Sequence, residues 1–243
     1  MRDALRILAL GSALLGLAAC GPAPETKKEE KTEVQAAPAA TPVAIVPAKT
    51  EAPAGTYKLD KAHANLEFRV NHIGFSNYTA RFTTFDAELQ FDPANPAASI
   101  VTATIDPRSL ALPTPPAGFL DTLLSEKWLG AAAFPQMTFR STKIELTGAN
   151  TARITGDLTL KGATAPVVLD ATFNGGYAGH PYDPNARIGF SAKGSLKRTA
   201  FGVSEGVPPP GSTMGVGDNV EIIVETEFNG PPLPKTDAPV KPQ

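Results

Sequence analysis

The stretch Leu66-Glu67-Phe68-Arg69-Val70-Asn71 decides the fold, because an apolar residue alternates with a charged or polar one throughout it. A period of two is typical of a β-strand that buries one face and leaves the other in water. Turn sequences such as Asn174-Gly175-Gly176 separate further stretches of this kind. These stretches begin at Val101, Ile154, Val167, Ile188 and Val220, and two more strands are predicted near residues 80–91 and 136–146.

One segment departs from this rhythm. In residues 116–130, Phe119, Leu120, Leu123, Leu124 and Trp128 recur at spacings of three and four, which predicts one amphipathic helix. The rest predicts about eight or nine antiparallel strands joined by short turns. We therefore expect an all-β fold, a single up-and-down barrel of about eight strands, since closure removes the exposed edges of a long sheet. A β-sandwich is the alternative, because alternation alone does not separate the two architectures.

The first twenty residues predict export. Arg2 and Arg6 precede an uncharged run over residues 7–19, and the run ends in Leu17-Ala18-Ala19-Cys20. This pattern is typical of a signal peptide, residues 1–19, followed by a cysteine that becomes the lipidated N-terminus. Two or more acyl chains, palmitate among them, anchor a protein stably. An ordinary signal peptide with an incidental cysteine is the alternative.

The residue after Cys20 bears on location. Gly21 rather than Asp stands there, which fits lipoproteins sorted to the outer membrane of a bacterium with two membranes. The predicted location is therefore extracytoplasmic, on the periplasmic face of that membrane.

Composition sets the remaining boundaries. Residues 20–54 are rich in Pro, Ala, Glu and Lys and predict a disordered linker, and residues 230–243 form a Pro-rich tail. The folded domain is thus predicted over residues 55–229. Its core forms without an internal disulfide, because Cys20 is the only cysteine. The 22 Lys and Arg residues nearly balance the 24 Asp and Glu residues, so no basic surface for nucleic acid is expected.

Motifs for catalysis or metal binding are weak. Gly202-Val203-Ser204-Glu205-Gly206 matches a nucleophile elbow, but three prolines follow at 208–210 and no histidine follows His180, so a loop is predicted. His63 and His72 would lie about 30 Å apart on extended chain. We therefore expect neither a metal site nor an enzyme, and no cofactor other than a bound lipid.

Several blocks resemble the YceI-like family of lipocalin-like, polyisoprenoid-binding barrels. They are residues 57–68, continuing to His72-Ile73-Gly74-Phe75-Ser76, then residues 134–142, 156–167, 187–190 and 198–202. The resemblance implies a barrel that binds an apolar lipid. The family's helix usually carries Arg-Asp-x-His-Leu, where this chain has Leu120-Asp121-Thr122-Leu123-Leu124, and Lys161 stands where the family usually has His. The change in the helix makes it more apolar than the family pattern.

An eight-stranded barrel is either filled by side chains or wide enough for one small ligand. Small residues on the inward face, namely Ala103, Gly156, Ala171, Ala192 and Gly194, either fit a tight taper or leave space. We expect an elongated apolar cavity, with the helix over its mouth. The predicted ligand-binding residues of cavity and lid are Phe68, Val70, Phe82, Leu89, Ile105, Leu120, Leu123, Leu124, Trp128, Phe139, Leu158, Leu160, Leu169, Phe173, Phe190, Leu196 and Ile222.

The predicted function follows from this cavity and the anchor. We expect a membrane-anchored protein that sequesters or carries a long apolar molecule, an isoprenoid or a fatty-acyl chain. Two alternatives stay open. One is an envelope structural or interaction module with a filled core, and the other is an enzyme that uses the cavity as its substrate site.

Overall fold

The structure, a computed structural model, describes residues 45–233. The predicted signal peptide, Cys20 and residues 21–44 of the predicted linker lie outside this range, as do residues 234–243 of the predicted tail. Ten strands form one sheet. They are β1 (Gly55–His72), β2 (Ser76–Phe82), β3 (Phe85–Phe91), β4 (Ile100–Ile105), β5 (Leu110–Ala111), β6 (Met137–Leu146), β7 (Thr151–Leu160), β8 (Ala163–Tyr177), β9 (Asn185–Lys197) and β10 (Val216–Pro232).

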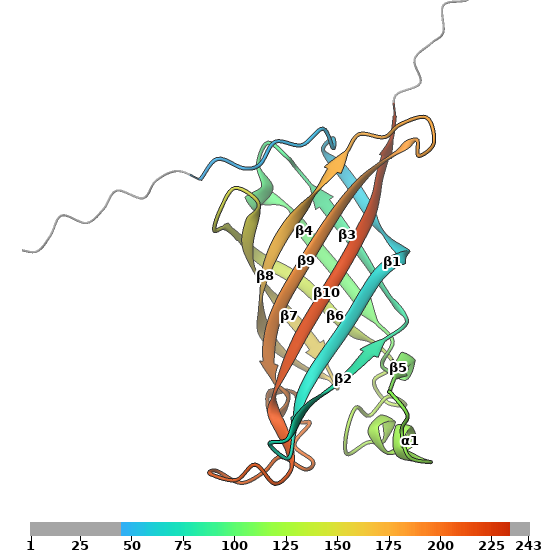
Figure 1. Ribbon diagram of the computed structural model, residues 1–243, viewed down its shortest axis with the longest axis vertical. Helices are drawn as coiled ribbons and strands as arrows, with labels where there is room; N and C mark the ends of the chain where they lie inside the picture. Colours follow the sequence, from blue (N-terminus) through green and yellow to red (C-terminus); the bar gives the residue numbers. More distant parts are fainter. Residues whose placement is uncertain (1–44, 234–243) are drawn as a thin grey trace, which may run out of the picture. The chain divides into compact units, whose positions relative to one another are not determined.

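The sheet closes on itself. Its strands follow the order β10-β9-β8-β7-β6-β4-β3-β1, and β1 pairs with β10 to complete a barrel of eight strands. All pairings are antiparallel, and the strands run steeply across the barrel (Figure 1). The predicted barrel is therefore confirmed over the sandwich. The β1–β10 pairing decides between the two, and the alternation is consistent with it because closure turns the apolar face of every strand inward.

Strand β1 belongs to two pairings on the same side. Its first residues, Gly55 to Lys58, pair with β3, whereas Leu66 to His72 pair with β2. Between these regions β1 bulges against β10, because Leu59 faces Phe228 but the next pair joins Ala64 to Thr226. The extra residues loop outward and re-aim the strand. At the lower end in Figure 1, the β1–β2 hairpin thus extends the wall beyond the closed barrel.

The helix is shorter than predicted. The predicted span, residues 116–130, contains only the six-residue α1 (Phe119–Leu124). Gly118 precedes it in the left-handed conformation without a side-chain cap, and Ser125 leaves the helix in an extended conformation. The chain then folds back in turns, in which Gly130 N–H donates to Ser125 O and Ala131 N–H donates to Leu124 O. The prediction of one long helix was wrong because spacing alone does not register missing caps.

The folded unit also begins earlier than the predicted residue 55. Ala52 is 2% exposed, Ala48 N–H donates to Ala149 O at 2.6 Å, and the Tyr57 hydroxyl donates to Pro53 O at 2.8 Å. Residues 45–54 therefore lie across one end of the barrel, drawn in blue in Figure 1. These contacts are mostly to backbone atoms, which a Pro- and Ala-rich sequence does not reveal. At the other terminus, β10 runs past the predicted boundary at Asn229 to Pro232.

Among residues 45–233, no helix is long and apolar enough to cross a membrane.

Candidate functional site: the apolar cavity of the barrel

The barrel is hollow. A cavity of about 730 Å3 lies inside it, bounded by the inward faces of the strands and by residues 112–129. Most predicted site residues border it. They are Phe68, Val70, Phe82, Leu89, Ile105, Leu123, Trp128, Phe139, Leu158, Leu160, Leu169, Phe173, Phe190, Leu196 and Ile222. Leu120 and Leu124 are not part of this lining, because α1 turns only its Phe119 and Leu123 toward the cavity. Contact of any of these residues with a ligand stays a prediction.

The small inward residues behave in two ways. At Gly156 a Cβ would lie 2.6 Å from Arg140 O and would overlap the ring of Phe139, and at Gly194 it would lie 2.7 Å from Leu169 Cδ2. These glycines therefore fit the tight packing of the wall. The three alanines, Ala103, Ala171 and Ala192, border the cavity instead. Space inside the barrel thus comes from the alanines.

Aromatic rings line the two halves of the cavity. Toward the end covered by residues 45–54, Phe173 lies between Phe91 and Phe190, with ring centres 6.2 and 5.4 Å apart. Toward the α1 end, Phe68 and Phe82 have ring centres 5.6 Å apart. Such contacts hold large apolar side chains in fixed positions. The rings therefore leave a defined space for an apolar chain.

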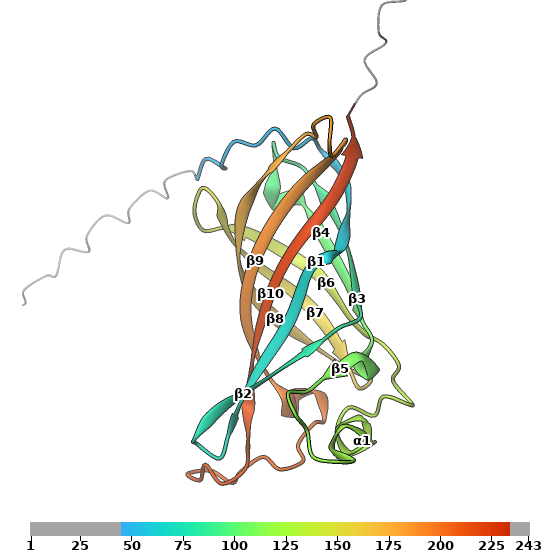
Figure 2. The same cartoon turned by 45° about the vertical axis from the view of Figure 1, so that its right-hand side comes forward.

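Exposed residues in the lining mark where the cavity opens. At the α1 end, His72, Phe119 and residues 113–116 are exposed and also border the cavity. Figure 2 shows this end, where the β1–β2 hairpin, the α1 segment and the loop that follows β9 come together. At the opposite end, Pro47, Ala48 and Thr50 partly cover the cavity, and Ala149 and Asn150 are exposed. The cavity thus opens at the α1 end, whereas the opposite end is partly covered.

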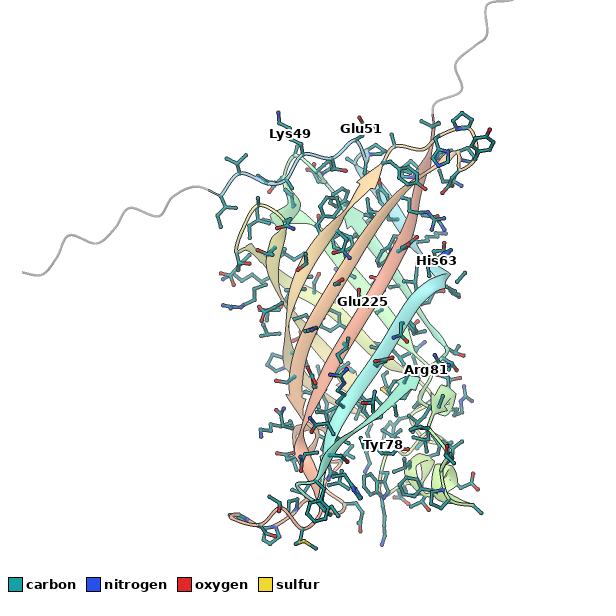
Figure 3. All side chains as sticks on the ribbon, viewed as in Figure 1. Lys49, Glu51, His63, Tyr78, Arg81 and Glu225 are labelled. Atoms are coloured by element: carbon teal, nitrogen blue, oxygen red, sulfur yellow. The ribbon has the colours of Figure 1, made fainter. Side chains whose placement is uncertain are left out.

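Sequence reasoning missed most of this opening. Tyr78 and residues 112–116 border the cavity, although their segments carry neither strand alternation nor helical spacing. Tyr78 lies on β2, on the side that faces the α1 segment (Figure 3). The available signal was the cluster Leu112-Pro113-Thr114-Pro115-Pro116, an uncharged and rigid stretch next to the predicted helix.

Four titratable residues border the cavity, namely Glu67, His72, Tyr78 and Arg198. Burial raises the pKa of the Tyr78 hydroxyl. Arg198 is 6% exposed and donates to four backbone oxygens at 2.7 to 2.9 Å, those of Val203, Glu205, Val216 and Gly217. Burial lowers its pKa. The guanidinium therefore holds the loop between β9 and β10 in place at the rim of the α1-end opening.

The α1 segment is fixed to the same rim. The ring of Trp128 covers the Arg198 guanidinium, and Lys161 Nζ donates to Lys127 O at 3.2 Å and to Gly202 O at 3.0 Å. Lys161 itself has a positive φ of 51° in the β7–β8 turn. Lys161, which stands where the family usually has His, thus joins the α1 segment to the end of the barrel. The Gly202–Gly206 motif lies in this region as a loop, as predicted, after a short turn of 3-10 helix (Arg198–Phe201).

A polar cluster lies outside the barrel at the β1 bulge. Arg187 Nη1 donates to Asp60 Oδ2 at 2.7 Å and to Glu227 Oε2 at 2.6 Å, and its Nε donates to Asp183 at 3.1 Å. His63 Nδ1 lies 2.9 Å from Asp60 Oδ2. The hydrogen bonds from His63 and then Arg187 lower the pKa of Asp60 to about 2. Asp60, His63 and Glu227 have the ligand types of a metal site, but the Arg187 guanidinium already forms ion pairs with both carboxylates.

With the cavity and its opening established, comparison with known proteins is informative. A model of the YceI-like domain matches residues 57–228. The chain belongs to the YceI-like family. A UPF0312 protein of Pectobacterium atrosepticum is 36% identical over 191 residues, which cover 77% of this chain and 93% of the relative. The YceI protein of Salmonella arizonae is 36% identical over 178 residues, or 72% and 86% of the two chains.

Solved structures share the YceI-like barrel. Burkholderia cenocepacia BcnA is 28% identical with a TM-score of 0.59, covering 70% of this chain and 98% of BcnA. The YceI protein of Campylobacter jejuni is 31% identical with a TM-score of 0.55, covering 70% and 95%. A polyisoprenoid-binding domain from Saccharophagus degradans is 13% identical with a TM-score of 0.51, covering 72% and 98%, and that likeness establishes the fold alone.

Proposed function

We propose that this YceI-like protein binds one long apolar molecule, an isoprenoid or fatty-acyl chain, inside its barrel and shields it from water. The cavity of about 730 Å3 is the observation that carries the proposal. Its volume falls in the range of small-molecule sites, roughly 300–1,000 Å3, and such sites are mostly apolar with a few polar groups. A polyisoprenoid-binding protein of the same fold supports this ligand class.

The driving force is the transfer of apolar surface from water to a dry interior, about 25 cal/mol per Å2 before the costs of association. The phenylalanines and leucines of the wall offer apolar contact along the whole cavity, whereas only four titratable residues border it. A filled structural core would leave no such space. An enzyme would need a nucleophile or acid held by a base, and no side-chain hydrogen bond in residues 45–233 joins two of the four titratable residues of the lining.

Binding of a fluorescent isoprenoid or fatty-acid probe tests the proposal. Saturation at one probe per chain is expected. Ala192→Phe places a ring into the cavity and should weaken binding at least about tenfold, or about 1.4 kcal/mol. Ala62→Phe, on the exposed β1 bulge, should leave affinity unchanged. Equal affinities of the two variants would contradict binding inside the barrel.

We further propose that Cys20 carries the lipid anchor that holds the protein at the periplasmic face of the outer membrane. The support is the sequence Leu17-Ala18-Ala19-Cys20 after an uncharged run. Cys20→Ala should abolish incorporation of a labelled fatty acid and leave the exported chain unprocessed. Label that persists on this variant would show that Cys20 is not the site of acylation.

A further inference from the structure

Three loops at the α1 end form a surface without charge, which we call the portal face. It consists of residues 73–78 in the β1–β2 hairpin, residues 112–119 before and at the start of α1, and residues 206–217 before and at the start of β10. None of these residues is Asp, Glu, Lys, Arg or His. The opposite end differs, since Lys49 and Glu51 are exposed there (Figure 3). The portal face is therefore a charge-free surface, and the exposed charges of Asp121, Glu126, Lys127 and Glu205 lie on residues that flank it.

The β1–β2 hairpin and the loop before β10 are in contact, and the chain after α1 approaches that loop. Ile73 N–H donates to Gly215 O at 2.8 Å, and a Cβ on Gly74 would lie 3.0 Å from Thr213 Oγ1. Trp128, which follows α1 and lies outside residues 112–119, would lie 3.9 Å from a Cβ on Gly206, so the chain after α1 reaches the loop before β10. Figure 2 shows the hairpin, the α1 segment and the loop before β10 at the same end of the barrel. They surround the opening of the cavity at that end.

Large apolar side chains project from this surface into solvent. Phe75 is 85% exposed, Met214 is 72% exposed and Phe119 is 36% exposed. Exposed apolar groups gathered at one site mark a surface that contacts a partner or a membrane. Phe119 also borders the cavity, together with residues 113–116. The exposed apolar surface is therefore continuous with the lining of the binding site.

The backbone at the tips is suited to an apolar medium. In lipid, a peptide group without a hydrogen-bond partner is costly. Phe75 N–H donates to His72 O, Met214 N–H donates to Ser212 Oγ, and Gly74 N–H donates to Asn71 Oδ1. The prolines at 208–210 have no N–H to satisfy. The tips thus expose apolar side chains without exposing the donors of those residues.

We infer that the portal face docks on the interface of a lipid bilayer and takes up the apolar ligand directly from it. A charge-free surface offers no ion pairs to orient a protein partner, whereas a neutral bilayer interface requires none. The inference rests on the proposed lipid-binding function and adds the surface through which the ligand enters. A ligand that passes from bilayer to cavity along Phe119 never crosses bulk water.

The first test locates the docking surface. The full chain with Cys20→Ser has no cysteine, so Phe75→Cys and, separately, Tyr182→Cys can each carry one environment-sensitive fluorophore. Tyr182 is 96% exposed in the β8–β9 turn and serves as the matched control. With phosphatidylcholine vesicles that contain nitroxide lipid, the label at position 75 should lose most of its fluorescence and the label at 182 should not, independently of salt.

Equal quenching at both positions, or none at position 75, would overturn the inference. A spectral shift at position 75 that depends on protein concentration without vesicles would assign the face to a second copy of the chain and would also overturn it.

The second test concerns transfer. The rate at which a fluorescent apolar probe moves from vesicles to the Cys20→Ser chain should rise with vesicle concentration. Phe75→Ser with Met214→Ser should slow this transfer at least about tenfold, with Tyr182→Ser as the control, while probe affinity in solution stays unchanged. A transfer rate that does not depend on vesicle concentration would overturn the docking inference and leave the proposed lipid-binding function intact. Loss of probe binding in solution by the parent chain would overturn the proposed function itself.

Discussion

The guanidinium carbon of Arg198 lies 5.3 Å from the ring centre of Trp128, so the end of the barrel contacts the α1 segment at this pair. Cation–π contacts of this kind stabilise by about 0.5–2 kcal/mol, depending on burial. Four backbone oxygens also accept from Arg198. The pair therefore links the α1 segment, the loop before β10 and the rim of the cavity opening.

Arg198→Met should lower the free energy of unfolding by about 2–4 kcal/mol, because carbonyl groups lose their donors at a site that is mostly buried. Chemical denaturation measures the loss. The emission of Trp128, the only tryptophan, should also change in the native state. Arg69→Met is the control, since Arg69 is exposed and its nearest acidic partner, Glu221, is 3.8 Å away. Equal stabilities of the two variants would contradict the structural role of Arg198.

Gly156→Ala should destabilise the barrel by about 1–3 kcal/mol, since a Cβ there would meet the Phe139 ring and Arg140 O. Gly189→Ala is the matched control in the neighbouring part of the sheet, because the nearest atoms to its Cβ would be 3.8 Å away. Thermal unfolding of both variants measures the difference. If Gly156→Ala melts at the wild-type temperature, the wall at β6–β7 is looser than the structure shows.

The Asp60 cluster predicts a pH dependence of stability. The pKa of Asp60 is about 2 in the fold against 3.8 ordinarily, so the unfolded chain binds a proton before the folded one does. The stability that Asp60 supplies is therefore present above about pH 4 and is lost as pH falls toward 2. Asp60→Asn should lower stability at pH 7 and flatten this acid dependence. Urea midpoints at pH 7 and pH 3 give the measurement, and parallel losses in both proteins would contradict it.

Two leucines of α1 separate a role in binding from a role in folding. Leu123 borders the cavity and Leu120 does not, although both are half-buried. Leu123→Asp should weaken the binding of an isoprenoid or fatty-acid probe, with the barrel still folded by circular dichroism. Leu120→Asp should weaken it less. Loss of fold in Leu123→Asp, with no probe binding by the wild type, would support a filled structural core instead.

Much of the barrel could be predicted because the alternation of apolar and polar residues that marks each strand is contained in a short stretch of sequence. Alternation in segments such as residues 66–70 and 154–160 fixes which side chains point inward. The choice of a barrel over a sandwich depends on the β1–β10 pairing, which alternation does not reveal. The same pattern brought most of the predicted cavity residues to one surface. The predicted helix was too long because the spacing of its apolar residues is helical over residues 116–130, whereas Gly118 and Ser125 confine the helix to Phe119–Leu124.

The features that were missed depend on contacts between distant parts of the chain. Arg187 pairs with Asp60 across 127 residues, and Ala48 binds the β6–β7 turn through its backbone. Arg198 stands out in the sequence only as part of a family block, and its four carbonyl acceptors come from the loop before β10 and from the first two residues of that strand. Charge-free loops at the cavity opening carry a compositional signal, but only the fold places them side by side.

Mass spectrometry of lipids extracted from natively purified protein tests the central claim most directly. The account predicts about one equivalent of a long-chain apolar lipid per protein molecule, reduced in Ala192→Phe and retained in Ala62→Phe. A protein that yields no such lipid, and shows no saturable binding of an apolar probe, would contradict the claim that the barrel is a lipid-binding site.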